Sequence, residues 1–88
     1  MRINPHFELV NVADDYLLVP VGDEMEHFNG TVVLNEVSAF IFEHLEKDQT
    51  EEELVNSLMD AYEVDSDTAR TDVHEALSKM KKLGIIYE

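Results

Sequence analysis

Histidine is the residue best suited to bind a metal or move a proton at neutral pH, and this chain has four: His6, His27, His44 and His74. No two of them are three or four residues apart, and each lies in a different predicted element, so nothing local brings two imidazoles together. The chain has no cysteine, which excludes a thiolate nucleophile, a thiolate metal site and a disulfide framework. We therefore expect no catalytic residues, no metal site and no enzyme activity.

Carboxylates are abundant, but their spacing indicates a solvated surface rather than a site. Glu51, Glu52 and Glu53 open a predicted helix, where negative charge stabilises the positive end of the helix dipole. The run Asp65-Ser66-Asp67 lacks the glycine and the distal glutamate of an EF-hand calcium loop. Ser66 starts a helix, as the modified serine of an acyl carrier protein does, but the strands predicted before the helices are the wrong layout for such a protein. With only three glycines the chain has no phosphate-binding loop, and we expect no cofactor.

The charge balance limits the partners. The chain has 20 acidic and 6 basic residues, a formal net charge of -14, which repels polyanions over a Debye length of about 8 Å. We therefore do not expect nucleic acid as a partner. No stretch approaches the roughly 18 consecutive apolar residues of a membrane span, and the absence of cysteine suits a reducing compartment, so we expect a cytoplasmic protein without membrane contact. A chain of 88 residues is expected to form a single domain over residues 1–88.

The first part of the chain has the composition of β-strands. Residues 7–12 alternate in part between apolar and polar side chains, and a polar turn leads to the apolar run of residues 16–20, which Pro20 ends or confines to an edge. Residues 30–34 form a third, β-branched strand after Asn29-Gly30, a dipeptide typical of tight hairpin turns. We assign residues 21–29 to a loop, although residues 25–28 could instead pair as an extra hairpin arm. Three antiparallel strands are expected.

The second part has helical periodicity and predicts helices over about residues 35–47, 50–63 and 66–83. Asn35 can cap the first, Thr50 and Glu53 form a capping box for the second, and Asp65 or Ser66 can cap the third. Gly84 suits a left-handed C-cap, after which residues 85–87 can fold back onto the core. The expected fold is α+β, a three-stranded antiparallel sheet followed by three helices.

The third predicted helix holds much of the positive charge of the chain. Arg70, His74 and Lys81 fall along one flank of the apolar stripe that contains Val73 and Leu77, at about 100° per residue. These basic residues either complement the helix dipole as ordinary surface or form one wall of a groove for an acidic peptide.

The strand at residues 30–34 would lie at an edge of the small sheet and present unpaired backbone N–H and C=O groups. Extended peptides add to such edges, because main-chain hydrogen bonds give affinity and side-chain pockets give selectivity. The same edge could pair with a second copy of the chain and form a homodimer. A groove between this edge and the third helix would combine backbone pairing with side-chain selection.

Several segments resemble the PqqD family. The family pattern is found in Tyr16-Leu17-Leu18-Val19-Pro20, in residues 28–35, in the acidic helix that starts at Thr50 and in the last helix, which ends Leu83-Gly84-Ile85-Ile86. Its most specific part is Leu34-Asn35 running into Ser38-Ala39-Phe40-Ile41-Phe42. The resemblance covers nearly the whole chain.

The resemblance implies a winged helix-turn-helix domain known as a RiPP recognition element, which binds the leader region of a ribosomally synthesised precursor peptide. It also implies a partner enzyme that modifies the delivered peptide, in this family a radical S-adenosylmethionine enzyme. The leader would add antiparallel to residues 30–34 and pack against the third helix. The peptide-binding residues implied in this way come from two segments: Phe28, Gly30, Thr31, Val32, Val33 and Leu34 from the strand, and Arg70, Val73, His74, Leu77 and Lys81 from the helix.

Two other functions stay open. The same topology can bind DNA through its last helix, but Asp65, Asp67, Asp72 and Glu75 offset the basic residues there and remove the electrostatic term that dominates non-specific affinity. The domain could also act only as an oligomerising or docking subunit, through pairing of its edge strand.

Overall fold

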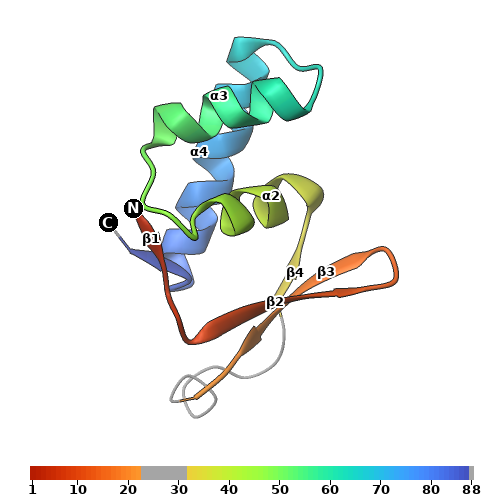
Figure 1. The fold of residues 1–88 in the computed structure, drawn as a ribbon, viewed down its shortest axis with the longest axis vertical. Coiled ribbons are helices and arrows are strands. Elements are labelled where there is room, and N and C mark those ends of the chain that lie inside the picture. Colours follow the sequence, from red (N-terminus) through yellow and green to blue (C-terminus); the bar gives the residue numbers. More distant parts are fainter. Residues whose placement is uncertain (23–31, 88) are drawn as a thin grey trace.

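The computed structural model describes residues 1–22 and 32–87 of the chain. These residues form the strands β1 (Arg2–Ile3), β2 (Phe7–Val12), β3 (Asp15–Pro20), β4 (Val32–Leu34) and β5 (Ile86–Tyr87) and the helices α2 (Glu36–His44), α3 (Glu51–Ala61) and α4 (Ser66–Lys82). The sheet lies on one side of the molecule and the helices gather on the other (Figure 1). Within the described ranges, the expected three-stranded antiparallel sheet followed by three helices is confirmed, and with it the α+β class.

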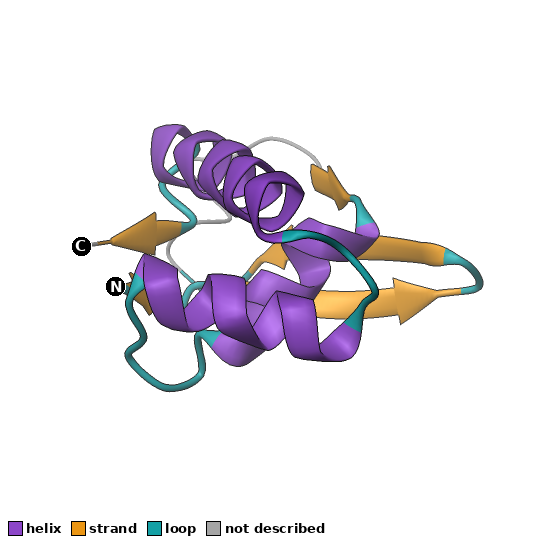
Figure 2. Ribbon diagram, turned by 90° about the horizontal axis from the view of Figure 1, so that it is seen from above, coloured by secondary structure: helices purple, strands orange, loops and turns teal. Residues whose placement is uncertain are grey.

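The sheet has the order β2-β3-β4, so β3 is central and the other two strands are its edges. β2 and β3 are joined by a two-residue turn in which Ala13 has a φ of 55°, the left-handed backbone that such tight hairpins need. Seen from above, this hairpin extends beyond the helices (Figure 2). β3 begins one residue earlier than expected, at Asp15, and only the Val32–Leu34 part of the third expected strand is described. The Asn29-Gly30 turn and the hairpin arm considered at residues 25–28 lie outside the described residues.

The three helices begin where their capping residues predict. The side chain of Asn35 accepts a hydrogen bond from the Ser38 N–H at 2.8 Å, and that of Asp65 accepts one from the Thr68 N–H at 2.7 Å. The capping box of α3 is complete, because Thr50 and the residue three positions on exchange bonds of 2.9 and 3.1 Å. Each cap satisfies backbone donors that a helix start leaves unpaired.

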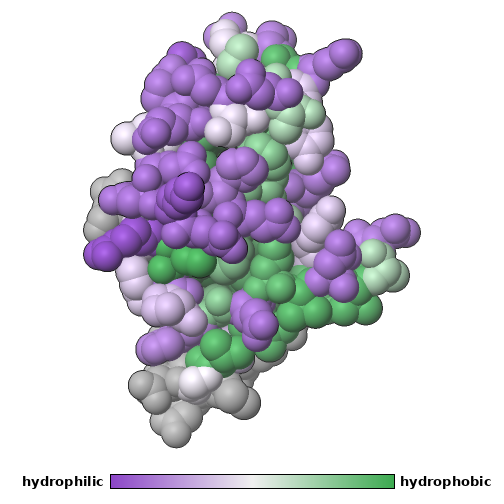
Figure 3. Space-filling view, viewed as in Figure 1, coloured by the Kyte–Doolittle hydropathy of each residue, from purple (hydrophilic) through white to green (hydrophobic). Residues whose placement is uncertain are grey.

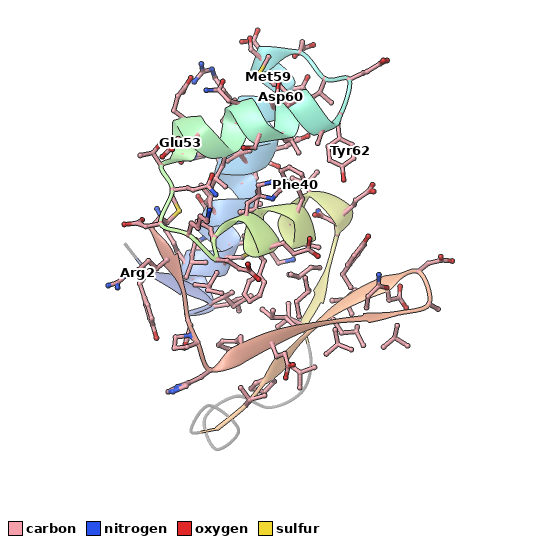
Figure 4. All side chains as sticks on the ribbon, in the orientation of Figure 1. Arg2, Phe40, Glu53, Met59, Asp60 and Tyr62 are labelled. Atoms are coloured by element: carbon pink, nitrogen blue, oxygen red, sulfur yellow. The ribbon has the colours of Figure 1, made fainter. Side chains whose placement is uncertain are left out.

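The helices end earlier than expected, by three residues in α2 and by one or two in the others. After α2, the side-chain amide of Gln49 donates a hydrogen bond to the carbonyl of His44. This carbonyl has no partner within the helix, so the bond satisfies it and allows the helix to end there. After α3, Tyr62 is already extended and its ring packs edge-on against Phe40 of α2 at 5.6 Å (Figure 4). After α4, Gly84 has a φ of 73°, as its predicted role as a C-cap requires.

A second, two-stranded sheet was not expected. β1 pairs antiparallel with β5, which brings the first and last described residues side by side (Figure 1). Asn4, which is buried, fastens this contact, because its side-chain amide donates to the Gly84 carbonyl at 3.0 Å and its N–H donates to the Ile85 carbonyl at 2.7 Å. Residues 85 and 86 are buried, so the expected return of this segment to the core is confirmed.

One hydrophobic core joins the inner face of the sheet to the three helices. Its largest fully buried side chains are Leu18, Ile41, Leu45, Leu54, Val55, Leu58, Val73, Leu77, Met80 and Ile85. α4 contributes its apolar stripe to this core and contacts both α2 and α3. The packing therefore fixes which flank of α4 faces each neighbour.

Candidate functional site

The edge of β4 presents the backbone of one residue to the outside of the sheet. Paired residues in an antiparallel ladder alternate between exchanging two hydrogen bonds and exchanging none. The Val21 N–H donates to the His6 carbonyl at 2.7 Å, which fixes this alternation along β3. Leu18 therefore bonds toward β4, where its partner is Val32. Val33 comes next and directs its N–H and C=O away from β3.

The side chains of β4 alternate in the same way. Leu34 is 5% exposed and belongs to the core, and Val32 is half-buried on the same face. Val33 points to the opposite face and is 60% exposed. Among the strand residues implied by the resemblance, Val32, Val33 and Leu34 thus lie together at the edge. Phe28, Gly30 and Thr31 lie outside the described residues, so their part in a site stays a prediction.

A groove of about 280 Å³ lies beside this edge, between the β4–α2 junction and α4. Leu34 and Ala76, which is 8% exposed, supply an apolar floor. Polar side chains of α4 form the wall, with both signs of charge: Asp72, Glu75 and Lys79. The beginning of α2 closes the other side with Asn35, Val37 and Ser38. An extended backbone along β4 would therefore meet an apolar floor and a charged wall.

The basic residues expected in that wall face another way. The two terminal guanidinium nitrogens of Arg70, Nη1 and Nη2, donate hydrogen bonds to the carboxylate of Glu52 on α3, at 2.7 and 3.0 Å. His74 Nδ1 lies 3.7 Å from a carboxylate oxygen of Glu51, also on α3. The bond and the charge of Arg70 lower the pKa of the Glu52 carboxyl, and Glu52 in turn raises the pKa of Arg70. The flank of α4 that carries Arg70 and His74 therefore faces α3 and not β4.

Two further residues of the expected wall are buried. Val73 is 0% and Leu77 is 1% exposed, because both lie in the apolar stripe that fills the core. Their side chains face the core and are covered in this structure, so their part in a peptide-binding wall stays a prediction. Lys81 lies on the same flank as Arg70, since eleven residues make about three helical turns.

The groove residues on α4 that the sequence did not indicate as peptide-binding residues are Asp72, Glu75, Ala76 and Lys79. They recur at the three- and four-residue spacing of one helix face, about opposite to Arg70 and Lys81. The signal that could have found them is the small side chain of Ala76, which shares one helix face with the charged Asp72 and Lys79 and leaves room beside the backbone of α4. Periodicity alone treats the two flanks of the stripe as equivalent.

The described residues hold neither a cluster of metal ligands nor a membrane-spanning helix. Within residues 1–22 and 32–87, no three His, Asp or Glu side chains lie close enough to share a metal ion. In the same part of the chain, no helix has the length and apolar character to cross a membrane. Arg70 and His74 are matched by carboxylates of α3, which weakens the case for DNA binding through α4.

Two solved structures share this fold. TbiB1, in complex with the TbiA(beta) leader peptide, superposes with a TM-score of 0.74 at 21% sequence identity, over 100% of this chain and 98% of that one. Lasso peptide synthetase B1, complexed with the leader peptide, superposes with a TM-score of 0.75 at 20% identity, over 99% of this chain and 96% of that one. At such identities the likeness establishes the fold alone.

A comparison of the sequence with family models identifies the family as well as the fold. No curated protein matches the chain. The family model of coenzyme PQQ synthesis protein D, PqqD, matches residues 16–86, from the central strand of the sheet to the last strand. Because this match spans most of the 88 residues, the chain belongs to the PqqD family.

Proposed function

We propose that this protein binds the leader region of a ribosomally synthesised precursor peptide and presents that peptide to a modifying enzyme, without catalysing a reaction itself. The observation that carries the proposal is the outward-facing backbone of Val33, one residue before Leu34, which lines the groove on α4. Membership of the PqqD family supports it, and so do the leader peptides bound to the two proteins of the same fold.

The peptide would add as an antiparallel strand next to β4. Its backbone would exchange two hydrogen bonds with Val33, because both polar groups of that residue point outward. Alternate peptide side chains would enter the groove over Leu34 and Ala76, where apolar residues fit. Asp72, Glu75 and Lys79 would select the charges at the ends of the bound segment.

The role of the protein would then be positional. A strand addition holds a peptide in one register and orientation, so the segment that follows the leader leaves the groove at a fixed place. We propose that a radical S-adenosylmethionine enzyme acts on this segment, as the family resemblance implies. The chemistry would belong entirely to that enzyme.

A titration followed by NMR tests the proposal. The probe is the synthetic leader segment of a ribosomally synthesised precursor peptide, added to uniformly labelled protein. We expect the largest amide shifts at Val32, Val33 and Leu34 and on the Asp72 and Lys79 face of α4. Shifts confined to the Arg70 and His74 flank, or no saturable shifts, would contradict the proposal.

Two simple measurements separate the alternatives. A gel shift at low salt with duplex DNA would revive a DNA-binding role if it gave robust binding. Light scattering with and without the peptide distinguishes peptide capture from self-pairing of the β4 edge, since a homodimer through that edge would dissociate when peptide binds.

A further inference from the structure

The opposite edge of the sheet has a cleft of its own. It measures about 630 Å³ and lies between β2 and the C-terminal end of α2. Its floor is apolar and is made of the buried Phe7 and Phe42 with the half-buried Ile3 and Leu9. On the face that carries α2 and β2, Figure 3 shows apolar surface between hydrophilic side chains.

The backbone of β2 is available at this cleft. The alternation fixed by the bond between Val21 and His6 directs Leu9 and Asn11 away from β3. Their N–H and C=O groups find no hydrogen-bond partner among residues 1–22 and 32–87, in which no strand lies beyond β2. β2 is therefore a second edge that can accept an added strand, and Leu9 marks where that strand would cross the cleft floor.

The rim of the cleft is uniformly acidic. Glu8 comes from β2, Glu43 comes from the last turn of α2, and Glu46 follows that helix. All three are exposed, and none forms an ion pair within the described part of the chain. The only other titratable group there is His44, whose Nδ1 lies 2.9 Å from the Phe40 carbonyl and whose ring stacks on Phe40 at 4.0 Å. The cleft thus combines an apolar floor, an open strand edge and negative charge.

We infer that this cleft docks an extended segment of a partner protein in which lysine or arginine alternates with apolar residues. The partner segment should alternate because successive side chains of an added strand point to opposite faces, so every second one would contact the apolar floor. The remaining side chains should be positively charged because they would lie near the three carboxylates of the rim. A second copy of this chain does not fit, because its edge strands β2 and β4 contain no lysine or arginine to meet the three carboxylates.

The inference stands on β2 and α2 and does not depend on the function proposed at β4. The two sites occupy opposite edges of one sheet, so both can be filled at once. This arrangement would let the protein hold a peptide at β4 while a basic segment of its partner is bound at β2.

The test uses a fluorescein-labelled ten-residue peptide of alternating lysine and valine, measured by fluorescence anisotropy at physiological salt. The double variant Glu43→Gln, Glu46→Gln should weaken its binding about three- to tenfold, the effect of removing two exposed ion pairs. The matched control is Asp60→Asn, Glu63→Gln, which removes the same amount of charge. Asp60 lies in the last turn of α3, far from the sheet (Figure 4), and Glu63 follows that helix. We expect this control to change affinity less than twofold.

A second peptide and NMR shift mapping on the protein complete the experiment. A peptide of the same composition, with its lysines in one block and its valines in another, should bind more weakly, because it cannot match a strand edge. NMR shifts should map to Leu9, Asn11 and the end of α2, and Val33→Pro should leave them in place. Equal losses in the two double variants, equal affinity for the block peptide, or shifts at β4 would each overturn the inference.

Discussion

Replacing Val33 by proline tests the contribution of the β4 backbone to peptide binding, because it removes one outward-facing N–H and leaves the side chains of the groove unchanged. Proline has no N–H and fixes φ near -65°, and within sheets it is tolerated only where the missing donor faces away from the ladder. Val33 meets this condition, because its polar backbone groups point away from β3. Its side chain is 60% exposed, so no core packing is lost.

The size of the effect follows from the number of hydrogen bonds at stake. An added strand would exchange two bonds with Val33, and the substitution removes the one that Val33 donates. The peptide carbonyl opposite would then be desolvated without a partner, which costs about 1 to 3 kcal/mol. This cost corresponds to a loss of about 5- to 150-fold in affinity.

The assay is anisotropy of the labelled leader segment, with urea unfolding of each variant as a check on the fold. Val33→Pro should lower the free energy of unfolding by less than about 1 kcal/mol, because the β3–β4 bonds remain. Val32→Pro is the positional control. Its N–H bonds toward Leu18, so that variant should be destabilised by about 1 to 3 kcal/mol.

Arg70→Ala is the control for the other flank of α4. Its guanidinium is bound to Glu52 on α3, so the variant should change peptide affinity less than twofold. If Val33→Pro bound the peptide as tightly as the native protein, or if Arg70→Ala cost as much, strand addition at β4 would be refuted.

Ala76→Leu should fill the groove and weaken leader binding about tenfold or more, whereas the binding isotherm would be unchanged if the groove were not the site. Because Ala76 is largely buried, the larger side chain should also lower the free energy of unfolding by about 1 to 3 kcal/mol, as measured in urea. Leu77→Ala should lower the free energy of unfolding by about 2 to 5 kcal/mol, as measured in urea, because the side chain is buried in the core. Thr50→Ala should lower it by about 1 kcal/mol through loss of the capping box, and a neutral result would show that the cap is not needed. Arg70 lowers the pKa of Glu52 in the folded state, so the stability from that pair is present above the ordinary glutamate pKa and is lost as the pH falls through the lowered one. The difference in Tm between the native protein and Glu52→Gln should therefore be seen at pH 7 and disappear as the pH falls through the lowered pKa of Glu52, and a difference that grew at low pH would contradict this sign.

Local signals in the sequence placed most of the secondary structure. The capping residues Asn35, Thr50 and Asp65 each begin a helix as predicted, since a cap acts within three residues of itself. Helix ends were less accurate, because a distant group such as the Gln49 amide can take over a terminal carbonyl. The pairing of β1 with β5 was missed, since two-residue strands more than eighty residues apart carry no periodic pattern.

The candidate site also has one part that local sequence signals predict and one part that depends on long-range packing. Its strand was predictable, because an edge strand follows from the order of short β segments, and Val32, Val33 and Leu34 do lie at an edge. The basic residues expected in its helical wall lie on the flank of α4 that faces α3. Asp72 and Lys79 line the groove, and Arg70 instead pairs with α3.

The α+β order, the start of each helix, the apolar stripe of α4 and the absence of cysteine chemistry all follow from the amino-acid sequence. These features depend on neighbours within a few residues or on composition. Which flank of α4 meets the sheet and which meets α3 follows only from the packing of the folded chain. A helical stripe has two flanks that are equivalent by periodicity, and the choice between them is made by how the core packs α4 against β4 and α3 together.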